Sequence, residues 1–174
     1  MISIRPASEI DAEALGVVGP AAYAAAYYGL WPDAAQLARH LHSFGPPAVA
    51  AFLAQPGASI WIAEEFGEAV GFLSLLLNSS EPITVAAGGA EIPRIFLLPN
   101  ARGAGTGRRL LKPALAAARR AGSRYLWLDA MASADWAIGA YRKWGFTPIG
   151  KTRFPKPVHP HLADMVVLKL DLEC

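Results

Sequence analysis

The spacing of hydrophobic and polar positions changes twice along the chain and divides it into three parts. In residues 8–53 apolar side chains recur every three to four positions, which predicts helices. Their expected starts lie near Ser8, at Trp31-Pro32-Asp33 and near Pro47. Residues 59–98 hold apolar runs typical of strands, predicted at 59–64, 69–77 and about 85–98. In the remainder, helices and strands alternate. Helices are expected from the end of the glycine loop to about residue 121 and at 135–144, and strands at 125–129, 146–154 and 162–170.

The connections between these elements predict how the strands pair. The short turn at Glu65-Phe-Gly-Glu68 joins its two strands as an antiparallel hairpin, and the last two strands can form another. The strand that ends near residue 98, the helix after it and the strand at 125–129 imply a right-handed parallel crossover. A short first strand is expected at Ile2 to Arg5, and Pro93 predicts an irregular strand where it stands. The sequence therefore predicts one α+β domain over residues 1–174, with a mixed, mostly antiparallel sheet, one βαβ crossover and helices on both faces.

Composition excludes several classes of protein. Hydrophobic residues make up 53% of the 174 residues and charged residues 17%, which argues against disorder. The formal net charge of +2 is too small to indicate a nucleic-acid surface. The uncharged stretch from Ala14 to Trp31 contains three glycines and a proline, so we expect no membrane span. Because Cys174 is the single cysteine, no internal disulfide is possible, and a reducing cytoplasmic setting is expected.

A glycine-rich loop carries the clearest chemical signal, at Arg102-Gly-Ala-Gly-Thr-Gly107. Glycines let the backbone approach a ligand closely, and the first amides of the following helix have no internal partner. Together with Arg102 and Arg108 these amides predict a pyrophosphate site. A P-loop would need Gly-Lys-Ser/Thr after the loop, and a dinucleotide fingerprint would need a third glycine at Arg108. Neither is present.

Arg102-x-x-Gly105-x-Gly107 resembles the acetyl-CoA signature of the GNAT superfamily of N-acetyltransferases. A second segment, Ala137 to Phe146, resembles the helix signature that ends in Tyr-x-Lys-x-Gly-Phe. The resemblance is strongest over about residues 91–150. It implies a GNAT-like (acyl-CoA N-acyltransferase) fold and an enzyme that transfers an acetyl group from acetyl-CoA to a primary amine. The segment from Glu91 to Leu98 also resembles the spermidine/spermine N-acetyltransferase-like branch.

The resemblance also implies roles for particular residues. Tyr141 would protonate the leaving thiolate, and Glu91 is the first candidate for the base, with Asp129 second. A backbone amide near Leu97 or Leu98 would stabilise the developing oxyanion. Ala134 stands where family members often carry an asparagine that holds the CoA arm. The expected cofactor-binding residues are Leu97, Leu98, Arg102, Gly103, Ala104, Gly105, Thr106, Gly107, Arg108 and Lys143.

Several alternatives stay open at the level of sequence. The acceptor is expected to be a small-molecule amine, although a protein N-terminus or lysine would suit the same chemistry. A CoA-binding module without transfer activity is a second class of function. The tyrosines at 23, 27 and 28 and Trp31 could line the acceptor pocket or pack in the core. The pairs His40/His42 and His159/His161 lack accompanying carboxylates or cysteines, so no metal is expected. The high apolar content makes a homodimer plausible.

Overall fold

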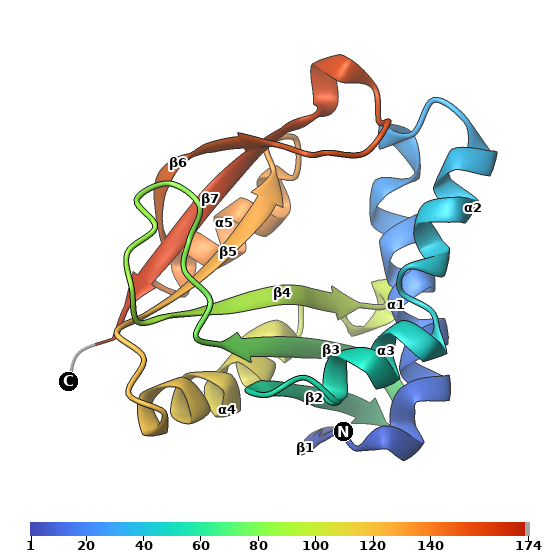
Figure 1. The fold of residues 1–174 in the computed structure, drawn as a ribbon. Coiled ribbons are helices and arrows are strands. Elements are labelled where there is room, and N and C mark those ends of the chain that lie inside the picture. The colour runs from blue at the N-terminus through green and yellow to red at the C-terminus, as the bar shows by residue number, and fades with distance from the viewer. Residues whose placement is uncertain (173–174) are drawn as a thin grey trace.

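A seven-stranded sheet runs through the molecule in the computed structural model, which describes residues 1–172 (Figure 1). The strands lie in the order β1-β2-β3-β4-β5-β7-β6, and only β4 and β5 pair in parallel. The predicted mixed sheet with one crossover is therefore confirmed. The strands are β1 (Ile2–Pro6), β2 (Ala58–Glu65), β3 (Glu68–Leu77), β4 (Gly89–Leu97), β5 (Tyr125–Met131), β6 (Thr147–Arg153) and β7 (Asp164–Asp171).

Helices cover both faces of the sheet. Helices α1 (Ala12–Tyr27), α2 (Ala34–His42) and α3 (Pro46–Leu53) gather on one side in Figure 1, away from α4 (Thr106–Arg120) and α5 (Asp135–Lys143). Short 3-10 turns lie at Glu9–Asp11, Tyr28–Leu30, Pro99–Ala101 and Pro160–Leu162. The helix start expected at Trp31-Pro32-Asp33 is confirmed, and the structure adds a cap there, because the Asp33 carboxylate accepts a hydrogen bond from the Ala35 amide at 2.6 Å. Among residues 1–172, no helix combines the length and the apolar character that a membrane span requires.

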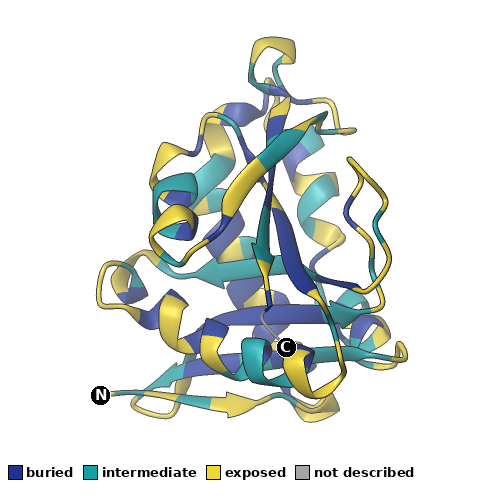
Figure 2. Ribbon diagram, turned by 90° about the vertical axis from the view of Figure 1, so that its left-hand side faces the viewer, coloured by how far each residue is buried: buried dark blue, intermediate teal, exposed yellow. Residues whose placement is uncertain are grey.

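Apolar side chains pack in layers on either side of the sheet, and the central strands are the most buried (Figure 2). On the side of α1 and α3, Leu15 and Phe52 pack against Ile62 and Phe72. On the opposite face α4 contributes side chains such as Leu110, as part of a larger cluster that continues to α5 and β7. At about 25 cal/mol per Å² of buried apolar surface, these layers supply the main favourable contribution to folding.

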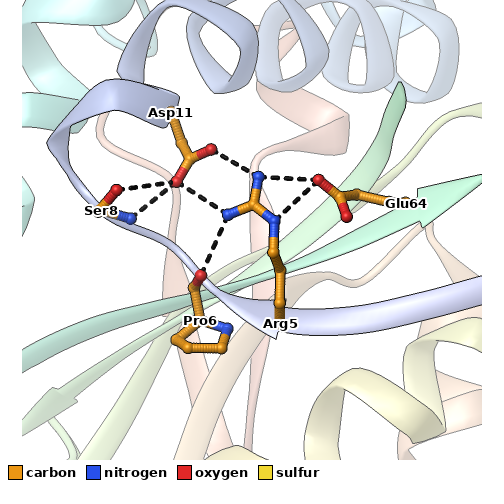
Figure 3. A network of polar contacts seen from close by, with 5 residues as sticks. All are labelled: Arg5, Pro6, Ser8, Asp11 and Glu64. Atoms are coloured by element: carbon orange, nitrogen blue, oxygen red, sulfur yellow. Dashed lines mark hydrogen bonds and ion pairs between the residues drawn. The ribbon is translucent and has the colours of Figure 1, made fainter. Parts of the chain in front are cut away.

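A polar network fixes the start of the chain (Figure 3). The Arg5 guanidinium donates to both carboxylate oxygens of Asp11, at 2.7 and 3.0 Å, and to Glu64 at 2.8 Å. The Ser8 amide donates to Asp11 at 2.8 Å, which caps the first helical turn. Because the Arg5 guanidinium hydrogen-bonds its charged form, the pKa of Asp11 falls from 3.8 to about 2.

The strand predicted from about residue 85 begins later than expected, at Gly89. The preceding segment is a loop built around Glu81, whose side chain is buried. The Glu81 carboxylate accepts hydrogen bonds from the amides of Ile83 and Thr84, at 2.6 and 2.9 Å. Val85 consequently adopts a left-handed φ of 56° and is exposed, so its β-propensity is overridden by this turn.

The strand β4 changes its pairing halfway along, as Pro93 predicts. On one edge, Arg94 pairs with Ser74 of β3, but Glu91 pairs with Leu76, so β4 holds one extra residue between them. This β-bulge brings Glu91 and Arg94 onto the same face of the sheet. On the other edge, β4 pairs with β5 only over residues 89–91, and the two strands then diverge (Figure 1). The divergence opens the sheet beside the glycine-rich loop.

Candidate active site

A cleft of about 760 Å³ lies where β4 and β5 diverge. It is bounded by the end of β4, the glycine-rich loop, α5 and the second half of α1. Its side chains are mostly apolar or aromatic, with a few polar groups, which is the usual character of a ligand site. The lining residues are Ala22, Ala26, Tyr27, Ile95, Phe96, Leu97, Arg102, Gly103, Gly105, Thr106, Gly107, Asp135, Trp136, Ala137, Gly139, Ala140, Tyr141, Lys143 and Trp144.

The glycine-rich loop has the backbone geometry that the sequence predicted. Gly103 and Gly105 have left-handed φ values of 81° and 76°, and Gly105 is the N-cap of α4. The first amides of α4 have no acceptor within the helix. Gly107 lines the cleft and also has a packing role that the sequence did not indicate. A Cβ there would lie 2.7 Å from the Trp144 ring, so this glycine lets α4 and α5 pack together.

The hydroxyl of Thr106 is the most informative polar group in the cleft. Thr106 is only 1% exposed, and its Oγ1 has no hydrogen-bond partner among residues 1–172. A buried hydroxyl without a partner costs about 1–3 kcal/mol, because it has lost its water without replacement. Thr106 lines the cleft at the start of α4, where an anion would be favoured by the helix dipole. The residues present therefore fit a phosphate-bearing ligand.

Arg102 is held by the backbone and does not extend freely into solvent. Its Nε donates to the Leu97 carbonyl at 3.1 Å, and its Nη2 donates to the Ala22 carbonyl at 3.4 Å. Its guanidinium also lies 5.2 Å from the centre of the Trp136 ring. Arg102 thus ties the end of β4 to α1 as well as placing positive charge in the cleft. Trp136 was missed at the level of sequence, since an exposed tryptophan in a first helical turn carries no motif.

Backbone pairing distinguishes the two amides expected near the reacting group. The Leu98 amide donates to the Val70 carbonyl at 2.9 Å, so it belongs to the ladder with β3. Hydrogen bonds alternate along an antiparallel strand, and the neighbouring Leu97 amide is therefore directed toward the other edge. That edge faces the divergence from β5. Of the two candidates, Leu97 is the one whose amide is directed toward the open edge.

Tyr141 lies on α5 with its ring buried and lines the same cleft. Its ring packs against Trp144 and Phe146, with centroids 5.5 and 6.2 Å apart. Burial raises the pKa of the Tyr141 phenol, with smaller contributions from Tyr27 and Asp129. The phenol therefore keeps its proton at neutral pH and can act as a hydrogen-bond donor.

Other predicted cofactor residues occupy varied positions. Lys143, at the end of α5, lines the cleft, whereas Ala104 and Arg108 are exposed and do not line it. Ala134 is buried and precedes α5 without a side-chain cap, so the polar contact of an asparagine is absent there. The binding roles of these residues stay predictions.

Glu91 lies outside the cleft lining, in a group of charged side chains on the sheet beside it. Its carboxylate accepts a hydrogen bond from Ser79 Oγ at 2.8 Å. Desolvation raises the pKa of Glu91, and the charge of Asp129 on β5 raises it further, against the opposing effect of Arg94. Asp129 is exposed, but partial desolvation of its carboxylate by the surrounding strands raises its pKa as well. The structure thus brings both candidate bases together.

The two histidine pairs differ in their surroundings. His40 packs among the rings of Tyr23, Trp31 and Phe44, with centroids 4.8–4.9 Å apart, whereas the rings of His159 and His161 lie only beside each other. Burial lowers the pKa of His40 from 6.5 to about 4. In the part of the chain that the structure describes, no three His, Cys, Asp or Glu side chains gather where they would hold a metal ion.

Comparison with known proteins gives relatives of one kind. The chain is 34% identical over 98 residues to IAA acetyltransferase of Azospirillum brasilense, covering 56% of this chain and 60% of that protein. It is 32% identical over 97 residues to the uncharacterized N-acetyltransferase YjgM of Escherichia coli (strain K12), covering 55% and 54%. The chain thus spans little more than half the length of these curated relatives.

The fold is also found among solved structures. The crystal structure of PaiA N-acetyltransferase from Thermoplasma acidophilum in complex with coenzyme A matches 99% of both chains with a TM-score of 0.79. The sequence identity is 18%, so this likeness establishes the GNAT-like fold alone.

The family of this chain follows from a match that spans most of its length. The model of the acetyltransferase (GNAT) family matches residues 22–146, which include the glycine-rich loop, the crossover and the helix of Tyr141. This match does not separate the branches of the family, so the resemblance to the spermidine/spermine branch stays a prediction. With most of its length matched to one family model, the chain belongs to the acetyltransferase (GNAT) family.

Proposed function

We propose that this protein is an N-acetyltransferase that transfers an acetyl group from acetyl-CoA to the primary amine of a small molecule. The observation that carries this proposal is the Thr106 hydroxyl, which has no hydrogen-bond partner among the described residues and lies at the start of α4, where the first helical amides have no acceptor within the helix. Gly105, Thr106 and Gly107 line a cleft that continues to Leu97 and Tyr141. A ligand that fills the cleft needs an anionic group at one end and a reactive group at the other, as acetyl-CoA has.

The cosubstrate would be held at two places. The amides of the loop and of the first turn of α4, together with Thr106 Oγ1, would bind the pyrophosphate. The open edge of β4 at Leu97 would hydrogen-bond the amides of the pantetheine arm. Lys143 stands at the far end of α5 and would offer positive charge to the nucleotide portion. Bound in this way, acetyl-CoA supplies a thioester carbonyl to the divergence between β4 and β5.

The chain's residues then serve three steps of one transfer. Glu91 takes a proton from the acceptor ammonium, directly or through water, and its raised pKa suits a base that works near neutrality. The amine nitrogen bonds to the acetyl carbon, while the Leu97 amide stabilises the charge on the carbonyl oxygen. The carbon–sulfur bond breaks, and the Tyr141 phenol donates its proton to the thiolate and regains one from the amine or from solvent. The products are an acetamide and free coenzyme A.

A thiol-release assay with acetyl-CoA and a panel of small amines tests this function. We expect turnover with at least one amine, and a fall in kcat/KM of roughly tenfold to a hundredfold in Tyr141→Phe, because the general acid is lost. Titration calorimetry with coenzyme A is the control, and its affinity should be the same in both proteins. Tight coenzyme A binding without turnover for any amine would refute the transfer activity.

A further inference from the structure

Arg94 is a partly buried cation that forms no ion pair with the described residues 1–172. Among residues 1–172, no carboxylate oxygen lies within 4.0 Å of its guanidinium, and the guanidinium donates no hydrogen bond. The guanidinium carbon lies over the face of the Phe44 ring, 4.8 Å from its centroid. Desolvation lowers the pKa of Arg94, which shows that its surroundings disfavour the charge. No Arg94 nitrogen is among the fully buried, unpartnered side-chain atoms of residues 1–172, so its N–H donors reach solvent and are available to a ligand.

The position of Arg94 connects it to the proposed reaction. The β-bulge places Arg94 on the same face as Glu91, separated by two strand steps, or roughly 7 Å. Phe96, the next residue on that face, lines the cleft and contacts Phe44 with ring centroids 5.6 Å apart. Ile95 and Leu97, which point to the opposite face, line the same cleft. The cleft therefore reaches the edge of β4, and Arg94 lies on the side where an acceptor would approach.

The imidazole of His40 lies near this arginine. Neither ring nitrogen of His40 has a hydrogen-bond partner among residues 1–172, and both are buried. The His40 ring contacts the same Phe44 ring that carries Arg94, with centroids 4.8 Å apart. The positive charges of Lys156 and Arg94 both act on His40, so the surroundings of His40 are electropositive. Along β4 from Arg94, the carboxylates of Glu91 and Asp129 make the surroundings of Glu91 electronegative.

We infer that Arg94 binds a carboxylate of the acceptor, and that the acceptor is a small amino acid-like molecule with its amine at Glu91. This inference rests on the proposed function, since it names the substrate class for that site. A bidentate guanidinium–carboxylate pair would replace solvent at the N–H donors of Arg94 and match the planar geometry of its guanidinium. The separation between Arg94 and Glu91 suits a compact molecule that carries both groups. A polyamine would instead place positive charge against Arg94, which opposes the polyamine-like acceptor that the branch resemblance suggests.

The test compares the free L-amino acids with their matched carboxamides as acceptors. We expect the best acids to exceed their carboxamides in kcat/KM by roughly tenfold to a hundredfold, as for a hydrogen-bonded charged group. A carboxamide lowers the pKa of the neighbouring amine, so more of the amine is neutral and reactive. This difference alone would favour the carboxamides, and a preference for the acids would therefore not be explained by it. In Arg94→Gln the ratio should fall close to one, and Arg94→Lys should retain part of it. Arg120→Gln, at the exposed end of α4, is the matched control and should keep the wild-type ratio.

A binding measurement separates this inference from the proposed function. Thermal stabilisation by each acid and carboxamide is recorded with coenzyme A present, where no acetyl group can be transferred. Turnover without preference for the acid, or an unchanged ratio in Arg94→Gln, overturns the inference and leaves the function standing. Stabilisation by acids that disappears in Arg94→Gln, without turnover for any amine, supports the carboxylate site and refutes the transfer. Absence of both turnover and stabilisation overturns both.

Discussion

Two groups of charged residues in this protein are built from the same residue types and arranged in opposite ways. At the start of the chain, Arg5 contacts Asp11 and Glu64 directly, and every charged group has a hydrogen-bonded partner. Beside the cleft, Arg94 and Glu91 share one face of β4 without an ion pair between them. The pKa of Asp11 is lowered by its partner, whereas that of Glu91 is raised by desolvation. Paired charges stabilise the folded chain, and charges held apart are available to a ligand.

The largest expected effect comes from removing the charge of the Glu91 carboxylate. Glu91→Gln should lower kcat/KM in the thiol-release assay by about a hundredfold, because a general base contributes roughly that factor. The midpoint of thermal unfolding should stay constant or rise, since a desolvated charge is removed. Glu68→Gln, at the exposed turn between β2 and β3, is the matched control. A loss of less than about threefold in Glu91→Gln would transfer the role to Asp129 or to water.

Breaking the paired group should have the opposite consequence. Asp11→Asn should lower the free energy of unfolding by about 1–2 kcal/mol, because two charged hydrogen bonds to Arg5 are weakened. Activity at 25 °C should be unaffected. Asp171→Asn breaks only an exposed pair with Lys169 and should cost about 0.5 kcal/mol or less. Urea titration of the three proteins provides the measurement.

The pH dependence of the same variant gives the sign of this contribution. Folded Asp11 binds its proton less tightly than the unfolded chain does, so its stabilising effect is complete above pH 3.8 and declines toward about 2. Asp11→Asn should therefore approach the stability of the original protein as the pH falls through this window. A constant difference between the two proteins down to pH 2 would contradict the assignment.

At neutral pH the smallest effect is expected at His40. Its folded pKa of about 4 lies below the unfolded value of 6.5, so the unfolded chain binds more protons between these values. Stability should therefore fall as the pH drops from 6.5 toward 4, and His40→Phe should lose this part of the decline. At neutral pH the variant should be as stable or slightly more stable, because two unpartnered nitrogens are replaced by an apolar ring. His42→Phe, an exposed position on the same helix, should keep the original slope.

Most elements of the fold could be predicted because their signals are local. A helix starts after Asp33, and the Glu65–Glu68 turn joins β2 and β3, as the sequence predicts. The early start assigned to β4 failed because the Glu81 carboxylate forms its own hydrogen-bonded turn. A carboxylate that bonds to amides two and three residues ahead leaves no periodic pattern in the sequence.

The candidate site was predictable only where a motif and a backbone requirement coincide. Gly103 and Gly105 have the left-handed conformations that the loop required. The contact between Trp136 and Arg102 joins residues 34 positions apart in sequence, on elements whose relative placement no local signal fixes. The shared face of Glu91 and Arg94 was hidden because residues three apart alternate faces in a regular strand. Only the bulge at Pro93 reverses that rule.

The limited pairing of β4 with β5 has a mechanical consequence. Strands β1–β4 and β5–β7 form two half-sheets whose strand ladder spans only residues 89–91 of β4, and the segment from residue 79 to 88 adds hydrogen bonds to Arg124, Tyr125 and Trp127 at the same end. A molecule bound in the cleft would link the two half-sheets, because it would contact both of them where no backbone hydrogen bonds join the strands. Occupancy should thus couple the two halves into one cooperative unit, and amide hydrogens on both sides of the gap should exchange more slowly with solvent when it is filled.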